Sequence, residues 1–205
     1  LKPANILVDN AGRVKILDFG VARLLDTDTR GTLITTNGQV LGTLAYMSPE
    51  QAGGDPQRSD VRTDVYSIGV MLYELLAGRP PLDVSKCGIA EALRRIGSAE
   101  PASLGTVDRS FRGDLATIVD RAIQKDPSRR YQSVAELAED IRRSLAGEPI
   151  LAKQDSTLYV IGKQIRRNKG PVAVATAAAV ALVAFSVYAT VQSGRKAVLA
   201  EQEAA

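Results

Sequence analysis

The sequence contains no histidine, no tryptophan and only one cysteine among its 205 residues. Without histidine, no Ser-His or Cys-His catalytic pair can form within these residues, and few ligand sets are left for a zinc ion. The single Cys87 excludes an internal disulfide and is typical of a reducing compartment. Its simplest interpretation is a small, partly buried side chain.

The bulk composition is that of an ordinary globular protein. The chain has 45% hydrophobic and 24% charged residues, as folded proteins do. Its 205 residues leave room for one folded domain and a tail. The formal net charge of +3 is small, so no nucleic-acid partner is expected. The first residue is not methionine and no signal peptide is visible, so we expect the sequence to be part of a longer protein.

Two short strings near the start carry groups that phosphate chemistry needs. LKPAN occupies residues 1–5 and DFG occupies residues 18–20. Between them, two apolar runs flank a segment whose Asn10 and Gly12 favour a tight turn, which predicts a β-hairpin. Lysine can neutralise phosphate charge, while amide and carboxylate oxygens are ligands for Mg²⁺. Considered alone, DFG is equally typical of a strand that ends in an Asp-Gly turn.

The segments that follow are predicted to be mainly helical. Residues 26–42 have no regular pattern and predict a loop. Apolar residues at helical spacing over residues 65–76 predict a largely buried helix. Asp114 is expected to cap a second helix, and a capping box at residues 133–136 is expected to open a third, which ends at Gly147. The inner faces of the last two helices are predicted to contain Leu115, Ile118, Val119, Ala122 and Ile123, and Leu137, Ile141 and Leu145.

Several strings, in a fixed order, resemble those of protein kinases. LKPAN resembles the end of the catalytic loop HRDLxxxN, and DFG resembles the metal-binding turn. GTLAYMSPE at residues 42–50 resembles the end of an activation segment, with SPE in place of APE. DVYSIGV (residues 64–70) and KDPSRRY (residues 125–131) resemble the central helix and the arginine segment of the lower lobe. Over about residues 1–147 the chain therefore resembles a eukaryotic-like bacterial serine/threonine protein kinase.

The resemblance implies an α+β, protein-kinase-like fold, with a mainly α-helical C-lobe and a small β-hairpin. Its implied cofactors are ATP and Mg²⁺, with Mn²⁺ as an alternative metal. Asn5 and Asp18 are implied as metal ligands. Lys2 is implied to reach the γ-phosphate and to mark Ser/Thr specificity, although without the motif it would be a solvated loop lysine. Thr43 is implied to form a hydrogen bond near the catalytic aspartate and lysine.

Other matched residues are implied to have structural roles. Phe19 and Gly20 complete the DFG turn. Glu50 and Arg130 are implied to form a buried ion pair that ties the activation segment to the lower lobe. Asp64 is matched to a carboxylate that holds the catalytic-loop backbone, and it is also a favourable charge at a helix start.

Regulation is predicted within the threonine-rich loop. Thr35 and Thr36 lie eight and seven residues before Thr43, close to where related bacterial kinases autophosphorylate. A phosphate there would add nearly two negative charges and could order the loop against arginines. A solvated loop is the alternative, and the nearby threonines Thr27, Thr29 and Thr32 are competing acceptors.

The run from Pro171 to Val191 carries no charged residue. About 20 residues at roughly 1.5 Å each cover about 30 Å, the thickness of a bilayer core. The run is rich in alanine, so a buried core helix is the alternative. Basic residues precede it, and the positive-inside rule then places its N-terminal side in the cytoplasm. We predict a kinase C-lobe (1–147), a basic juxtamembrane linker with few helix signals (148–170), a single transmembrane helix (171–191) and the start of an extracytoplasmic segment (192–205).

The leading hypothesis is a membrane-anchored serine/threonine kinase that transfers the γ-phosphate of ATP to proteins in signal transduction. Its expected partners are ATP, protein substrates and the lipid bilayer, and a homodimer is left open. The alternative is a pseudokinase or scaffold, against which Lys2, Asn5 and Asp18 count; a plain membrane anchor ranks last. An aspartate before Leu1 would indicate an enzyme. The chain alone is expected to be inactive, because it lacks that aspartate and the upper-lobe ATP-binding residues.

Overall fold

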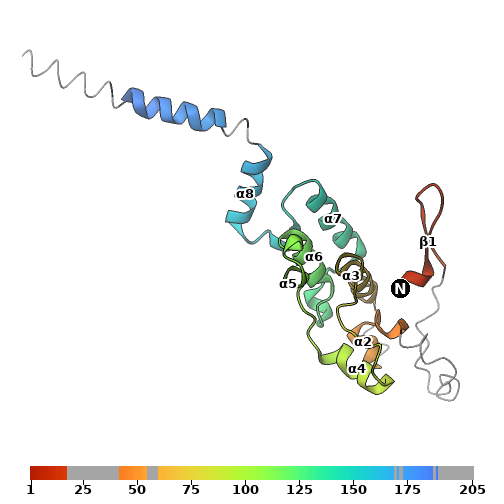
Figure 1. Cartoon of the computed structure of the whole chain (residues 1–205). Coiled ribbons are helices and arrows are strands. Elements are labelled where there is room, and N and C mark those ends of the chain that lie inside the picture. The colour runs from red at the N-terminus through yellow and green to blue at the C-terminus, as the bar shows by residue number, and fades with distance from the viewer. Residues whose placement is uncertain (18–41, 55–59, 169, 171–172, 187, 189–205) are drawn as a thin grey trace, which may run out of the picture. The chain divides into compact units, whose positions relative to one another are not determined.

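The computed structural model describes residues 1–17, 42–54, 60–168, 170, 173–186 and 188 (Figure 1). The chain divides into two compact units. The first consists of residues 1–146 with 150–152, and the second of residues 147–149 with 153–205. Each unit is described by itself below.

The first unit begins with the predicted hairpin, which is confirmed. A short 3-10 helix, η1 (Pro3–Asn5), leads into the antiparallel strands β1 (Ile6–Val8) and β2 (Val14–Ile16), with Ile6 opposite Ile16. Oδ1 of Asp9 accepts hydrogen bonds from the backbone N–H groups of Ala11 and Arg13, each at 2.9 Å. Gly12 has a φ of 76°, a left-handed conformation that suits glycine because it has no Cβ. The turn is therefore specified locally.

The other described elements of the first unit are helices, as predicted. The helix α3 is capped by Asp60, whose side chain accepts from the N–H of Arg62, and it ends at Gly78 with a φ of 70°. The elements are α2 (Pro49–Ala52), α3 (Val61–Ala77), α4 (Ile89–Ser98), α5 (Leu104–Val107), η5 (Arg109–Phe111), α6 (Asp114–Ala122), η6 (Pro127–Arg129) and α7 (Val134–Leu145).

The main core forms where α3 packs against α5 and α6. Its buried side chains are Tyr66, Val70, Tyr73, Leu104, Ala116, Val119 and Ile123. Gly69 allows the close approach of α3 and α6, because a Cβ there would lie 2.7 Å from Cβ of Ala122. A smaller cluster, formed by Leu44, Val84, Ala92 and Ile96, lies between the segment before α2 and helix α4. This smaller cluster supports residues 42–50.

Two predicted helix caps differ from the structure. Gly113, with a φ of 116°, precedes α6, and Asp114 is the first helical residue instead of the cap. At α7, Ser133 accepts from the N–H of Glu136 at 3.1 Å, as predicted. The Glu136 carboxylate, however, accepts from the N–H of Gln132 at 2.9 Å and not from that of Ser133, so the capping box is not reciprocal. The sequence pattern located both helix starts to within one residue.

The predicted inner face of α7 was partly wrong. Leu137 is buried, but the side chain of Leu145 is 81% exposed. The buried neighbour of Leu137 is Asp140, because residues three apart share a helix face. Leu145 is eight residues after Leu137, which places it roughly 80° around the helix axis from Leu137. The Asp140 carboxylate accepts from the hydroxyl of Tyr131 at 2.8 Å and from the backbone N–H of Ala152 at 2.9 Å. This carboxylate fixes residues 150–152 against α7.

The second unit contains more helix than the sequence predicted for the linker. A short η7 (Leu151–Lys153), whose first residues belong to the first unit, precedes α8 (Thr157–Arg167). Residues 173–186 are also helical, and their side chains are exposed. Over the parts of the chain that are described, we find no helix with the length and apolar character needed to cross a membrane.

Candidate active site

The segment before the hairpin positions Lys2 and Asn5. Pro3 begins η1, and the N–H of Asn5 donates to the carbonyl of Lys2 at 3.0 Å. The carbonyl of Asn5 accepts from the N–H of Leu17 at 2.9 Å, which joins the start of the hairpin to its end. Asn5 is buried, whereas the hairpin residues Leu7 and Val14 are exposed. These backbone hydrogen bonds therefore hold Asn5 beside Leu17, the residue that precedes DFG.

Lys2 and Thr43 meet across 41 residues of sequence. The Nζ of Lys2 donates to Oγ1 of Thr43 at 3.1 Å in a partly buried contact. The next residue, Leu44, is buried in the smaller core cluster, which anchors the segment from below. The structure thus brings together the two residues to which the resemblance assigned catalytic roles. The roles themselves stay predictions.

The segment after Thr43 is held by α3. The hydroxyl of Tyr46 donates to Oε2 of Glu74 at 2.5 Å, and Oγ of Ser67 donates to the carbonyl of Tyr46 at 3.0 Å. Burial, together with the hydrogen bond to Glu74 and the charge of Glu74, raises the pKa of Tyr46 to about 12. Sequence reasoning missed Glu74. No local signal distinguished Glu74, because its partner Tyr46 lies 28 residues earlier in the sequence.

Glu50 and Arg130 form a buried, bidentate ion pair. Both N–O distances are 2.8 Å, and the side chains of Arg130 and Glu50 are 0% and 4% exposed. Glu50 is fixed at the start of α2, where Ser48 and Gln51 form a capping box. The serine that replaces alanine in the SPE string therefore has a role as a helix cap. The pair is located where the resemblance predicted it.

Arg130 uses its remaining donors on backbone carbonyls. Its guanidinium donates to the carbonyls of Arg62 (3.1 Å), Gln124 (2.7 Å) and Lys125 (3.0 Å). Burial by itself would raise the pKa of Glu50, but the hydrogen bonds and charge of Arg130, with a hydrogen bond from Thr63, lower it overall. Glu50 is therefore held as a carboxylate. The pair joins α2, the start of α3 and the segment after α6.

Asp64 lies on the first turn of α3 and is exposed. Among the residues that the structure describes, none forms a hydrogen bond with its carboxylate. Its location fits the favourable interaction of a carboxylate with a helix N-terminus. The contact with the catalytic-loop backbone stays a prediction.

Several predicted site residues lie outside the described residues. They are Asp18, Phe19, Gly20, Thr35 and Thr36. Within the described ranges, no three His, Cys, Asp or Glu side chains are grouped to hold a metal ion. Asn5 fits a Mg²⁺ site by its chemistry, because a neutral amide oxygen is a hard ligand that suits a site already rich in phosphate and carboxylate charge.

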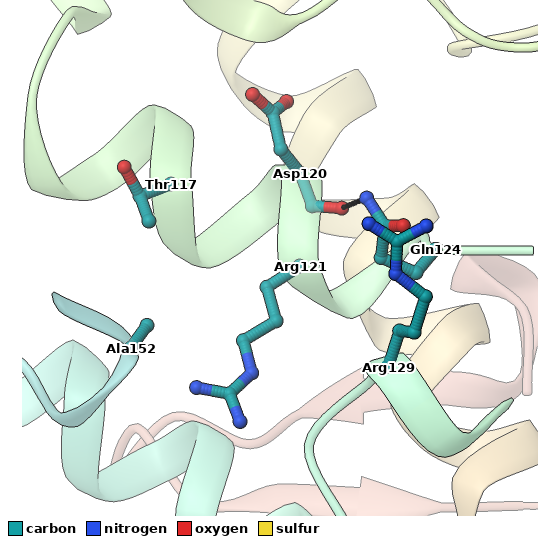
Figure 2. A pocket seen from close by; sticks show the side chains of 6 residues that line it. All are labelled: Thr117, Asp120, Arg121, Gln124, Arg129 and Ala152. Atoms are coloured by element: carbon teal, nitrogen blue, oxygen red, sulfur yellow. Dashed lines mark hydrogen bonds between the residues drawn. The ribbon is translucent and has the colours of Figure 1, made fainter. Parts of the chain in front are cut away.

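A separate surface pocket lies between α6, η6 and η7 (Figure 2). The Asp120 carboxylate there is already engaged, because it accepts from Oγ of Ser103 at 2.5 Å and from the N–H of Leu104 at 3.2 Å. In Figure 2 the side chains of Arg121 and Arg129 extend in different directions, so they do not converge as a phosphate cradle would. The pocket is lined by Thr117, Asp120, Arg121, Gln124, Arg129 and Ala152.

The fold and the candidate site define a class of protein. A small two-stranded sheet, a mostly helical body and a buried ion pair between α2 and the segment after α6 form a kinase-like domain. A family model described as "Protein kinase domain" matches residues 1–141. The chain belongs to the protein kinase domain family.

Relatives with curated names are bacterial serine/threonine kinases. The chain is 40% identical over 150 residues to the probable serine/threonine-protein kinase SCO3848 of Streptomyces coelicolor. The aligned residues are 73% of this chain and 21% of that protein. It is 38% identical over 149 residues to the serine/threonine-protein kinase PknB of Mycobacterium tuberculosis, covering 73% of this chain and 23% of that protein. The chain thus spans between a fifth and a quarter of the length of these relatives.

Proposed function

We propose that the protein containing this chain is a serine/threonine protein kinase, which transfers the γ-phosphate of ATP to protein hydroxyl groups. The observation that carries the proposal is the contact between Lys2 and Thr43 beside the buried Asn5, within a domain of the kinase family. In-line phosphoryl transfer needs charge neutralisation and positioning more than covalent help from the protein. A lysine held by a hydrogen bond to a hydroxyl group, close to a buried asparagine, is suited to that task.

Each residue has a defined task in this proposal. Lys2 places a positive charge against the γ-phosphate, and Thr43 fixes its ammonium group by accepting a hydrogen bond. Asn5 and Asp18 would hold Mg²⁺, which when bound neutralises the charge of the ATP phosphates. Glu50 and Arg130 hold the end of the activation segment, so that its Tyr46 is kept on α3.

The test uses a protein that contains these residues together with a complete kinase domain. Asp18→Ala should abolish Mg·ATP-dependent phosphorylation of a generic Ser/Thr acceptor, because the metal loses its carboxylate. Asp9→Asn is the matched control, since Asp9 is a turn carboxylate of the same hairpin without a catalytic role. Activity of the Asp18→Ala protein within about tenfold of wild type would contradict the assignment. ATP binding without any transfer by the wild-type protein would favour the pseudokinase alternative.

A membrane anchor is the second part of the proposal. It is supported by the uncharged run from Pro171 to Val191, by the basic residues before it, and by the exposed apolar side chains of the helical residues 173–186. A reporter that is active only outside the cytoplasm, fused after Ala205, should be active. Replacing Arg166, Arg167 and Lys169 with glutamine should weaken that signal. A reporter that behaves as cytoplasmic would contradict the anchor but leave the kinase proposal intact.

A further inference from the structure

Helix α8 has an apolar face that is exposed. Leu158, Ile161 and Ile165 are spaced by three and four residues and therefore lie on one side of the helix. Their exposed fractions are 84%, 49% and 47%. Three large apolar side chains exposed together on one helix indicate a contact with something apolar.

The opposite side of α8 is basic. At about 100° per residue, Lys163 and Arg167 lie roughly 140–180° around the helix axis from Leu158. The helix contains no acidic residue, and Arg166 adds a third positive charge to its sequence. Arg167 pairs with Glu148 at 2.6 Å, but both side chains are about half exposed, at 52% and 39%, and surface pairs of this kind contribute little stability. A competing anion can therefore replace Glu148.

We propose that α8 lies along the surface of an anionic bilayer, with Leu158, Ile161 and Ile165 in the boundary between headgroups and acyl chains. Lys163 and Arg167 then face the anionic headgroups. Exposed apolar residues on one face and basic residues on the other, without acidic ones, are the pattern of an interfacial helix. The positive charge of α8, with no acidic residue to balance it, favours an anionic lipid surface as the occupant of this face. The uncharged run begins at Pro171, only four residues after α8 ends.

This inference is separate from the membrane span, because a helix can bind a bilayer surface without crossing it. The test uses a protein with a complete kinase domain, in which Cys87 is replaced by serine and a single cysteine carries an environment-sensitive fluorophore. The labelled positions are Leu158→Cys and Ile165→Cys on the apolar face, with Val160→Cys as the control, because Val160 lies roughly 140–160° around the helix axis from both. Vesicles contain brominated lipid as a quencher, in phosphatidylcholine with or without phosphatidylglycerol.

On anionic vesicles, the probes at 158 and 165 should be quenched at least about twofold more than the probe at 160. The pair Lys163→Glu and Arg167→Glu should remove this difference, whereas Lys86→Glu with Arg109→Glu, both exposed positions of the first unit, should leave it unchanged. Equal quenching at all three positions would overturn the proposal. A probe at 158 that is already shielded from solvent in the absence of vesicles would also overturn it, because the apolar face of α8 would then pack against protein. If the reporter after Ala205 is cytoplasmic but the quenching pattern persists, the span fails and the α8 proposal stands.

Discussion

Replacing Arg130 with methionine should lower the free energy of unfolding of the kinase domain by about 3–5 kcal/mol, the usual cost of leaving one member of a buried ion pair without its partner. The Arg130 side chain is fully buried and donates two hydrogen bonds of 2.8 Å to the Glu50 carboxylate. Methionine fills much of the same space but has no donor. The variant therefore deprives a nearly buried carboxylate and three backbone carbonyls of the hydrogen bonds that Arg130 donates in the native structure. The variant also loses the cation–π contact in which the Arg130 guanidinium lies 4.9 Å from the ring centre of Tyr66.

Urea unfolding at neutral pH, followed by circular dichroism, measures this loss in a protein with a complete kinase domain. Arg94→Met is the matched control, because Arg94 forms an ion pair with Glu91 at the same distance of 2.8 Å, but with 68% of its side chain exposed. The control should lose much less stability than the Arg130 variant, because an exposed ion pair is screened by solvent. Domains are stable by only about 5–15 kcal/mol, so the Arg130 variant is expected to show a much lower transition midpoint. If the two variants lose equal stability, burial is not what gives the pair its strength.

Three further predictions use the same protein. The pKa of Glu50 in the folded state is below its ordinary 4.5, so its contribution to stability is present above about pH 4.5 and is lost as the pH falls through the folded value. Glu50→Gln should therefore flatten the loss of stability in acid, measured by unfolding at several pH values. An unchanged acid profile would contradict the reasoning. Thr43→Val should lower kcat by roughly tenfold or more, because a hydrogen bond to the charged Lys2 is worth about 1.5–3 kcal/mol. Thr43→Ser should keep most of the activity. Equal rates for the two variants would refute a role for the hydroxyl. Mass spectrometry of autophosphorylated protein should find phosphate on Thr35 or Thr36, and phosphate found only outside residues 26–43 would contradict the predicted regulatory site.

Short-range features were predictable from the sequence. The turn at Asp9 to Gly12 uses hydrogen bonds within five residues, so its pattern specifies the hairpin without help from the rest of the chain. The helix starts at Ser133 and near Asp114 are similarly local, although a glycine, and not the aspartate, occupies the cap of α6. The family resemblance pointed to Lys2, Thr43, Glu50 and Arg130, because these motifs have a fixed order and spacing. Periodicity failed at Leu145, since eight residues do not return to the same face of a helix.

Contacts between distant segments were decided by the tertiary structure. Nothing in the local sequence of Glu74 shows that its carboxylate accepts the hydroxyl of Tyr46, because the partners are 28 residues apart and meet only when α3 packs beneath the segment after Thr43. Asp140 looks like an ordinary surface charge in a helix until residues 150–152 return to it, at which point burial and three hydrogen-bond donors make it a core residue. The sequence determined which elements form and which family they belong to, since those depend on local spacing. Folding determined which charges are buried, since burial depends on what the rest of the chain places around them.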